Sequence, residues 1–230
     1  MAAGRASVIA IDGPAASGKS TLARRLAETL GYLYFDTGLM YRAVTRAALD
    51  QGIPPEDETA VGRLAEEMEI DVVAAPADDP PYRVLVGGQD VTRSLRARQV
   101  DANVSQVSAY QQVRQAMTAR QREIGQRRQV VMVGRDIGTV VLPDADLKIY
   151  LEASAEARAR RRFLEVQAKG ESTGYEAILK SMRARDAYDS TRSIAPLKPA
   201  DDAVVLDTTD LSIDETYERT LALVRAAAQT

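Results

Sequence analysis

Short apolar runs separated by helical patterns dominate the chain. Five runs are long enough for buried strands, and they cover residues 8–12, 33–35, 130–133, 147–151 and 203–206. After the first run, Leu22, Leu26 and Leu30 recur every four residues, which is the spacing of an amphipathic helix. Strands that alternate with helices predict an α/β fold, a five-stranded parallel sheet with helices on both faces.

One region interrupts this alternation. Residues 70–92 contain two short runs of alternating apolar and polar residues, separated by prolines and glycines. This pattern predicts a small antiparallel β insertion, flanked by a helix at about 57–69. Near the end of the chain, Ser212 and Glu215 have the spacing of a capping box, which predicts the start of a last helix.

Composition narrows the class of protein. The 230 residues, 45% of them apolar, predict one domain with a large core. A net charge of −3 argues against a nucleic-acid partner. Without cysteine or histidine, disulfides, thiolate metal sites and imidazole bases are excluded. No run approaches a membrane span and the first residues lack the apolar segment of a secretion signal, so we expect a cytoplasmic protein.

The most informative motif is the loop GPAASGKST, which follows the first strand and opens the first helix. It has the GxxxxGKS spacing of a phosphate loop, in the strand-to-helix context that such a loop requires. Backbone N–H groups and the helix N-terminus bind phosphates, Lys19 reaches the β- and γ-phosphates, and the Ser20 hydroxyl is a natural ligand for Mg2+. A chance match in a surface loop is the alternative, and the flanking elements argue against it. The predicted ATP-binding residues are Gly13, Pro14, Ala15, Ala16, Ser17, Gly18, Lys19, Ser20 and Thr21.

Polar residues that follow the predicted strands are candidates for a second site. GTPases, transport ATPases and small-molecule kinases share the phosphate loop, so the acceptor site must discriminate among them. Thr37 and Arg42 open the helix after the second strand and suit a bound phosphate; the alternative is a helix cap by Thr37 with a solvated Arg42. Arg135 and Asp136 follow the third buried run, where they either pair with each other or face a ligand.

Charged residues also continue an apolar helix stripe. Ile178 and Met182 lie on that stripe, and Arg185, Asp189 and Arg192 extend it at steps of three and four residues. We expect these charges to face inward. The alternative is a surface Arg–Asp pair on a helix that bends or ends earlier.

A cluster of arginines occurs farther back in the chain. Arg158, Arg161 and Arg162 share one helical face, where mutual repulsion calls for balancing anions. A triphosphate under a lid would supply them. The alternative is a basic surface face matched by Glu156 and Glu165.

Four motifs together resemble bacterial cytidylate kinases: DTGLMYR, GRDIGTVV, RARRR and RARDAYDSTRSIAPLKPA. The resemblance runs essentially end to end and includes the insertion. It implies a P-loop kinase that transfers the γ-phosphate of ATP to CMP or dCMP, with Mg2+ as cofactor, acting as a monomer. It also implies a core of residues 1–37, 106–154 and 193–230, a monophosphate-binding part at 38–105 with the β insertion at about 70–98, and a short helical lid at about 155–192.

The resemblance assigns a role to each candidate residue. The α-phosphate of CMP would be held by Arg42 and Arg135. Cytosine contacts would come from Thr37, Asp136, Arg114 and Arg192. Pentose contacts would come from Ser105, Arg185 and Asp189. Catalysis would depend on Lys19 and Arg135 and on the lid arginines Arg158 and Arg162.

The chain departs from the family pattern at two site positions. Thr37 stands where the family usually has serine, which keeps the hydroxyl and adds a methyl group. Val133 stands where many members have aspartate, so a carboxylate that could hold Mg2+ through water is missing and Ser20 is the only metal ligand we name. Ser105 and Arg114, nine positions apart, cannot face one way on a single helix, so we also expect a break near residues 108–110.

Two other functions remain open from the residues alone. Another P-loop kinase, for adenylate, uridylate or shikimate, would share the phosphate loop. A GTP-binding switch would share it too, but the chain lacks the Asn/Thr-Lys-x-Asp guanine motif.

Overall fold

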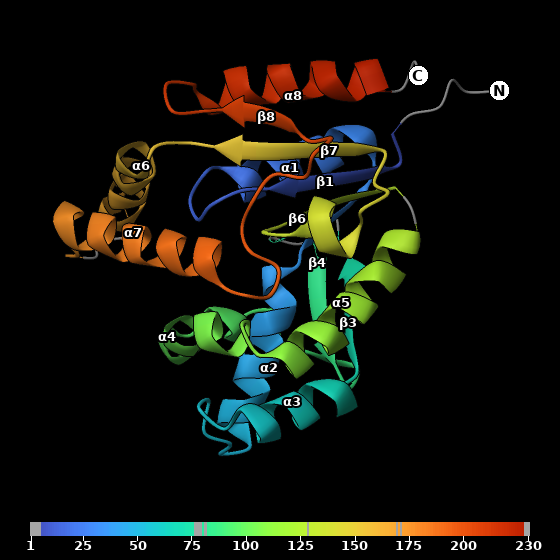
Figure 1. The fold of residues 1–230 in the computed structure, drawn as a ribbon, viewed down its shortest axis with the longest axis vertical. Coiled ribbons are helices and arrows are strands. Elements are labelled where there is room, and N and C mark those ends of the chain that lie inside the picture. Colours follow the sequence, from blue (N-terminus) through green and yellow to red (C-terminus); the bar gives the residue numbers. More distant parts are fainter. Residues whose placement is uncertain are drawn as a thin grey trace. The chain divides into compact units, whose positions relative to one another are not determined.

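The computed structural model describes residues 6–75, 80, 82–127, 129–168, 170 and 172–227. Five strands form the main sheet in the order β2-β6-β1-β7-β8. In Figure 1, β1, β7 and β8 can be followed side by side. They are β1 (Val8–Asp12), β2 (Leu33–Asp36), β6 (Val130–Gly134), β7 (Leu147–Glu152) and β8 (Val204–Asp207). β7 pairs in parallel with β1 on one side and with β8 on the other. The predicted five-stranded parallel sheet is confirmed.

Helices connect these strands. The α-helices are α1 (Lys19–Leu30), α2 (Gly38–Asp50), α3 (Glu58–Glu67), α4 (Arg98–Val107), α5 (Gln111–Gln126), α6 (Ala155–Ala168), α7 (Tyr175–Thr191) and α8 (Ile213–Ala227). Two short segments complete the set, the 3-10 turn η1 (Ser94–Arg96) and the π-helical turn η2 (Ile137–Val141). The capping box before α8 forms as predicted, with the Ser212 amide donating to Glu215 Oε2 at 2.8 Å and the Glu215 amide donating to Ser212 Oγ at 3.2 Å.

The chain divides into two compact units, Met1–Tyr32 with Val131–Thr230, and Leu33–Val130. The first unit holds β1, β7, β8 and most of β6, together with α1, α6, α7 and α8. The second unit holds α2 to α5 and a three-stranded antiparallel sheet of β3 (Ile70–Ala74), β4 (Tyr82–Val86) and β5 (Gln89–Asp90). This small sheet confirms the predicted insertion, whereas the finer division into core, monophosphate-binding part and lid stays a prediction.

The apolar runs in the middle of the main sheet are buried, whereas the run at one edge is exposed. Ile9, Ala10 and Ile11 of β1 are fully buried, as are Leu22 and Leu26 of α1. The strand predicted at 203–206 forms as β8, but the prediction that it is buried is wrong, because Val204 and Val205 are exposed. β8 is one of the two edge strands of the sheet, with a strand neighbour on one side alone.

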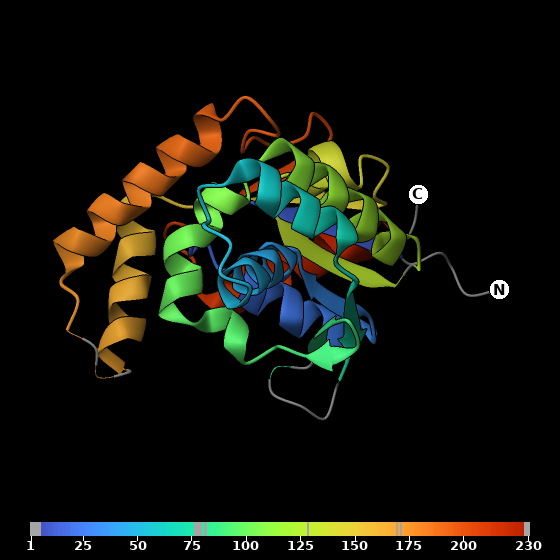
Figure 2. The same ribbon diagram turned by 90° about the horizontal axis from the view of Figure 1, so that it is seen from below.

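Helices α6 and α7 form a pair with an apolar centre of its own. Figures 1 and 2 show the two helices side by side. Their buried residues are Ala159, Val166, Ile178, Leu179 and Met182. Phe163 and Tyr175 pack against this cluster and meet each other edge to face, with their ring centroids 6.3 Å apart. Because the family resemblance predicts a lid at about 155–192, we call α6 and α7 the lid helices from here on.

The predicted helix break near residues 108–110 is confirmed. α4 ends at Val107 and α5 begins at Gln111. At the break, Ser108 Oγ donates to the Ser105 carbonyl at 3.0 Å and the Tyr110 hydroxyl donates to the Pro55 carbonyl at 2.8 Å. Within the described ranges, none of the helices is both long and apolar enough to cross a membrane.

Candidate functional site

The loop between β1 and α1 has the backbone of an anion-binding turn. Positive φ angles occur at Gly13 (145°), Ala16 (58°) and Gly18 (92°). A Cβ at Gly13 would lie 2.2 Å from the Leu151 carbonyl oxygen, so no larger residue fits there. Alternation of right- and left-handed residues turns successive N–H groups toward one concavity, which suits phosphate oxygens.

Lys19 is the first residue of α1 and lies over this loop. Its side chain is buried, and Nζ donates to the Pro14 carbonyl at 2.5 Å and to Ser17 Oγ at 3.3 Å. These acceptors are neutral, whereas triphosphate oxygens carry full negative charge and form stronger hydrogen bonds with an ammonium group. Ser20, next in the helix, is exposed. The residues predicted to bind ATP therefore lie together at one strand-to-helix turn.

Asp12, the last residue of β1, is a buried carboxylate that we did not place in the predicted site. It is 5% exposed and accepts hydrogen bonds from the amides of Ile137 (2.8 Å) and Gly138 (2.7 Å). Burial raises its pKa to about 6 and the nearby charge of Asp136 adds to the rise, against the two amides and Lys19, which lower it. Asp12 thus caps the turn η2 from a distant strand. Its position directly before the phosphate loop was the available sequence signal.

The raised pKa of Asp12 predicts a pH dependence of stability. The folded protein binds a proton at Asp12 more tightly than the unfolded chain does. The contribution of Asp12 to the free energy of unfolding therefore increases as the pH falls from above 6 toward 4. Relative to Asp12→Asn, the ligand-free wild type should gain about 1 kcal/mol in free energy of unfolding between pH 7.5 and pH 5. Urea unfolding of both proteins at the two pH values measures this gain.

Asp144→Asn, at an exposed position, is the surface control for that experiment. If the difference in free energy of unfolding between wild type and Asp12→Asn stays constant with pH, Asp12 titrates alike in the folded and the unfolded chain.

The end of β6 meets the end of α7 through two ion pairs. Arg135 Nε lies 2.9 Å from Asp189 Oδ2, and Arg192 Nη2 lies 3.9 Å from Asp136 Oδ1. Asp136 and Asp189 are buried. The structure thus brings together four predicted substrate residues from segments more than fifty positions apart. Each of the two pairs joins one residue that follows β6 to one residue at or just after the end of α7, so the four charges balance one another.

Arg185 does not share this environment. Ile178, Met182 and Asp189 on the expected stripe are buried, but Arg185 is exposed, so the prediction that it faces inward is wrong. The apolar cluster of the lid helices ends at Met182, and nothing in that cluster covers the next turn on that face. Asp189 is buried because Arg135 reaches it. The alternative, a surface pair of Arg185 with Asp189, is also wrong, because Asp189 is buried and pairs with Arg135.

The arginines of α6 have three different environments. Arg158 is buried and forms a two-point ion pair with Asp186 of α7. Arg161 donates to the Thr208 carbonyl. Arg162 is exposed and pairs with Glu165 at 3.1 Å. Each of the two readings of this face therefore describes part of it: Arg162 has the expected surface glutamate, and Arg158 and Arg161 are tied to structure beyond the helix.

In the second unit, Thr37 and Arg42 bracket the first turns of α2. Thr37 is buried, and its side chain does not cap the helix. Asp36 Oδ1 accepts from the Gly38 amide at 3.0 Å instead. Arg42 Nη1 lies 2.6 Å from Asp101 Oδ1 and 3.1 Å from the Leu95 carbonyl oxygen. The alternative of a solvated Arg42 with Thr37 as side-chain cap does not describe this turn.

Arg114 and Ser105 lie on either side of the α4–α5 break. Arg114 is buried in α5, donates to the Ser108 carbonyl at 3.2 Å, and has its guanidinium carbon 5.6 Å from the ring centroid of Tyr41. Ser105 is half-buried in the last turns of α4. All four predicted residues of this unit therefore lie on or beside α2, α4 and α5.

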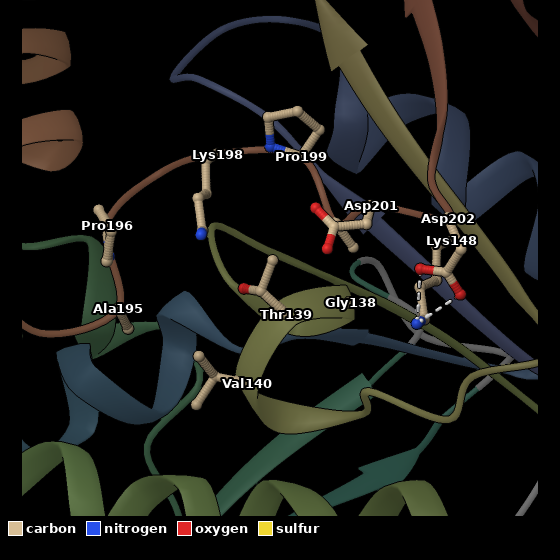
Figure 3. Close-up of a pocket in the computed structure, with 11 residues that line it drawn as sticks. Gly138, Thr139, Val140, Lys148, Ala195, Pro196, Lys198, Pro199, Asp201 and Asp202 are labelled. Atoms are coloured by element: carbon tan, nitrogen blue, oxygen red, sulfur yellow. Dashed lines mark hydrogen bonds and ion pairs between the residues drawn. The ribbon is translucent and has the colours of Figure 1, made fainter.

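A cavity of about 440 Å³ lies beside η2 in the first unit. Figure 3 shows Thr139 and Val140 of η2 on one side of it and the segment 195–202 on the other. Lys148 Nζ donates to both carboxylate oxygens of Asp202, at 2.8 and 2.7 Å (Figure 3). The lining includes none of the residues predicted to bind ATP or CMP. The Lys148–Asp202 pair anchors the chain that leads from α7 to β8.

Among the residues that the structure describes, no group of three or more acidic, histidine or cysteine side chains could hold a metal ion. Val133, which stands where many members of the family that the sequence resembles have aspartate, is buried in β6. Ser20 offers a hydroxyl oxygen at the start of α1. An oxygen donor suits Mg2+, which keeps several waters and takes few protein ligands.

Known proteins similar to this chain agree with one another. The model of the cytidylate kinase family matches residues 9–226. A cytidylate kinase of Shouchella clausii is 49% identical over 94% of this chain and 95% of its own length. One of Bacillus licheniformis is 48% identical over 96% and 97%, and one of Herpetosiphon aurantiacus is 47% identical over 96% and 95%.

A solved structure supports the fold. A gluconokinase of Sinorhizobium meliloti superposes with a TM-score of 0.50 at 14% identity, over 97% of this chain and 94% of its own. That likeness concerns the fold alone. The phosphate loop, the charges that join β6 to α7 and the match over nearly all of the sequence lead to one conclusion: the chain belongs to the cytidylate kinase family.

Proposed function

We propose that the chain transfers the γ-phosphoryl group of ATP to CMP or dCMP, giving ADP and CDP or dCDP. The observation that carries the proposal is its identity of 47–49% to cytidylate kinases along at least 94% of its length. A phosphate loop with its lysine in place, in a chain without histidine, suits this reaction. The acceptor is a phosphate oxygen that already carries negative charge, so the transfer needs no general base.

The donor side is built from the phosphate loop. ATP phosphates would lie against the backbone of residues 13–18, and Lys19 would exchange its neutral acceptors for β- and γ-phosphate oxygens. Ser20 would hold Mg2+ together with ATP oxygens and water. When bound, the metal neutralises charge on the transferring phosphate.

The acceptor side is built from arginines that are already oriented. We assign the α-phosphate of CMP to Arg42 and Arg135, whose guanidinium groups pair with Asp101 and Asp189. The incoming phosphate must compete with a carboxylate at each arginine. In return, each arginine is held in one orientation before the substrate arrives, which lowers the entropy cost of binding.

The remaining assignments stay as the family resemblance gives them. Cytosine contacts are Thr37, Asp136, Arg114 and Arg192, and pentose contacts are Ser105, Arg185 and Asp189. Of all nine substrate residues, Arg42 and Arg135 included, Arg185 is the most solvated and would order on binding. The lid arginines Arg158 and Arg162 stay assigned to ATP. We further propose that the protein is a cytoplasmic monomer, which light scattering of the purified chain and its fractionation from cells test.

A substrate comparison tests the proposed activity. With ATP and Mg2+, kcat/KM for CMP and dCMP should exceed that for UMP and AMP on the order of a hundredfold, since a site built for one pattern of donors and acceptors leaves polar groups unpaired with another. A coupled assay for ADP, with a no-acceptor blank and an EDTA control, measures this. A kcat/KM for AMP or UMP that equals or exceeds the value for CMP would show that cytidylate is not the preferred substrate.

A further inference from the structure

The buried ion pair of the lid helices also reaches the phosphate loop. Arg158 Nη1 and Nη2 donate to Asp186 Oδ1 and Oδ2 at 3.1 and 2.6 Å. Nη1 donates in addition to the carbonyl oxygen of Ala15 at 3.1 Å, and Nε donates to the Ala153 carbonyl at 2.9 Å. One guanidinium therefore joins α6, α7 and the loop that binds ATP.

A second contact joins the same parts. Ala16, in the left-handed region at φ 58°, packs against the apolar cluster of the lid helices. Backbone strain of this kind persists where the surroundings hold it. Two successive residues of the phosphate loop, Ala15 and Ala16, are thus in contact with the lid helices, one through a hydrogen bond and one through packing.

The donor count of Arg158 shows what Asp186 contributes. A guanidinium has five N–H groups, and the four hydrogen bonds above use four of them. One N–H of Nη2 is left without a partner among the described residues. A carboxylate held at two points fixes the plane of the guanidinium, and with it the direction of that last donor.

We propose that Asp186 is a positioning residue of the ATP site: it holds Arg158 against the phosphate loop and so aligns the lid helices with the bound triphosphate. Asp186 itself does not touch the substrate. This proposal rests on the proposed kinase function where kcat is measured. The affinity for ATP is a second measurement, which does not require catalysis.

The test is a double-mutant cycle. Asp186→Asn keeps the shape of the side chain but turns an N–H group toward a donor of Arg158, which breaks the two-point pair. We expect affinity for a non-hydrolysable ATP analogue, measured by calorimetry with Mg2+, and kcat to fall about tenfold, while KM for CMP changes less than twofold. In an Arg158→Ala background, Asp186→Asn should cause no further loss, because its effect passes through Arg158.

A matched control lies on the same two helices. Glu156 of α6 pairs with Arg183 of α7, and both side chains are exposed. Glu156→Gln removes an ion pair between the lid helices without touching the phosphate loop, and it should leave ATP-analogue affinity unchanged.

The outcomes separate cleanly. Equal losses from Asp186→Asn with and without Arg158 would overturn the proposal, and so would an unchanged ATP-analogue affinity. Should Asp186→Asn fail to fold, Asp186→Glu takes its place in the same cycle, because it keeps the carboxylate but changes where the two-point pair holds Arg158; an ATP-analogue affinity equal to wild type would then overturn the proposal. If the wild type binds the ATP analogue but does not phosphorylate CMP, the proposed substrate is wrong and the binding cycle still tests Asp186.

Discussion

Lys19→Ala is expected to lower kcat by at least about a hundredfold, because Lys19 places a positive charge beside the phosphoryl group as it passes from ATP to the acceptor phosphate. In the ligand-free protein its ammonium group already sits over the phosphate loop, on the Pro14 carbonyl and Ser17 Oγ. No other lysine lies in the motif. Steady-state kinetics with saturating ATP and CMP measure the loss.

Folding and charge need separate controls in that experiment. Lys19→Met keeps most of the length and apolar stem of the side chain and should lose as much activity as Lys19→Ala, with far-UV circular dichroism and melting temperature close to wild type. Lys180→Ala, at an exposed position of α7, is the neutral comparison. A Lys19→Ala enzyme with more than about a tenth of wild-type kcat would remove Lys19 from the proposed role.

Asp136→Asn is expected to narrow the preference for CMP over UMP, mainly through loss of CMP activity. Cytosine presents an N4 amino donor beside the N3 and O2 acceptors, whereas uracil presents an O4 acceptor and an N3 donor. A carboxylate accepts from N4, and against uracil it meets a carbonyl oxygen. Asn can donate to O4, so the ratio of the two kcat/KM values should fall on the order of tenfold or more from its wild-type value.

The structure supplies a second explanation that the same measurement separates. Asp136 also lies opposite Arg192, with 3.9 Å between Arg192 Nη2 and Asp136 Oδ1. If Asp136 only holds Arg192 in place, Asp136→Asn should lower the activity with CMP and with UMP by the same factor and leave the ratio unchanged. Asp144→Asn, exposed and outside the site, controls for the loss of one negative charge.

Local patterns were enough for most of the framework. The five apolar runs became the five strands of the main sheet, and the alternating segment became a three-stranded sheet. The phosphate loop could be located because its chemistry depends on neighbours in sequence: Gly13 has no space for a side chain, and Lys19 opens the helix that follows. The break before α5 followed from the requirement that Ser105 and Arg114 share a ligand.

Pairings between distant segments depended on the tertiary structure. Periodicity says which face of a helix is apolar but not where its partner surface ends, so Arg185 was expected inside and is exposed, while Asp189 is buried because Arg135 reaches it. Val204 and Val205 of the edge strand β8 are exposed despite their apolar character, whereas Phe35 of the other edge strand β2 is buried, so what covers a strand is decided by packing.

The electrostatics of the site could not be derived from the sequence either. Burial raises the pKa of Asp12 to about 6, and burial is a property of everything packed around a group. Arg158 was identified from a run of arginines, but its partner Asp186 stands 28 positions away on another helix. By itself, the sequence determined the strands, the phosphate loop and the family. Only the tertiary structure decided which carboxylate each arginine meets, because ion pairs form between side chains that packing brings within a few ångströms, whatever their separation along the chain.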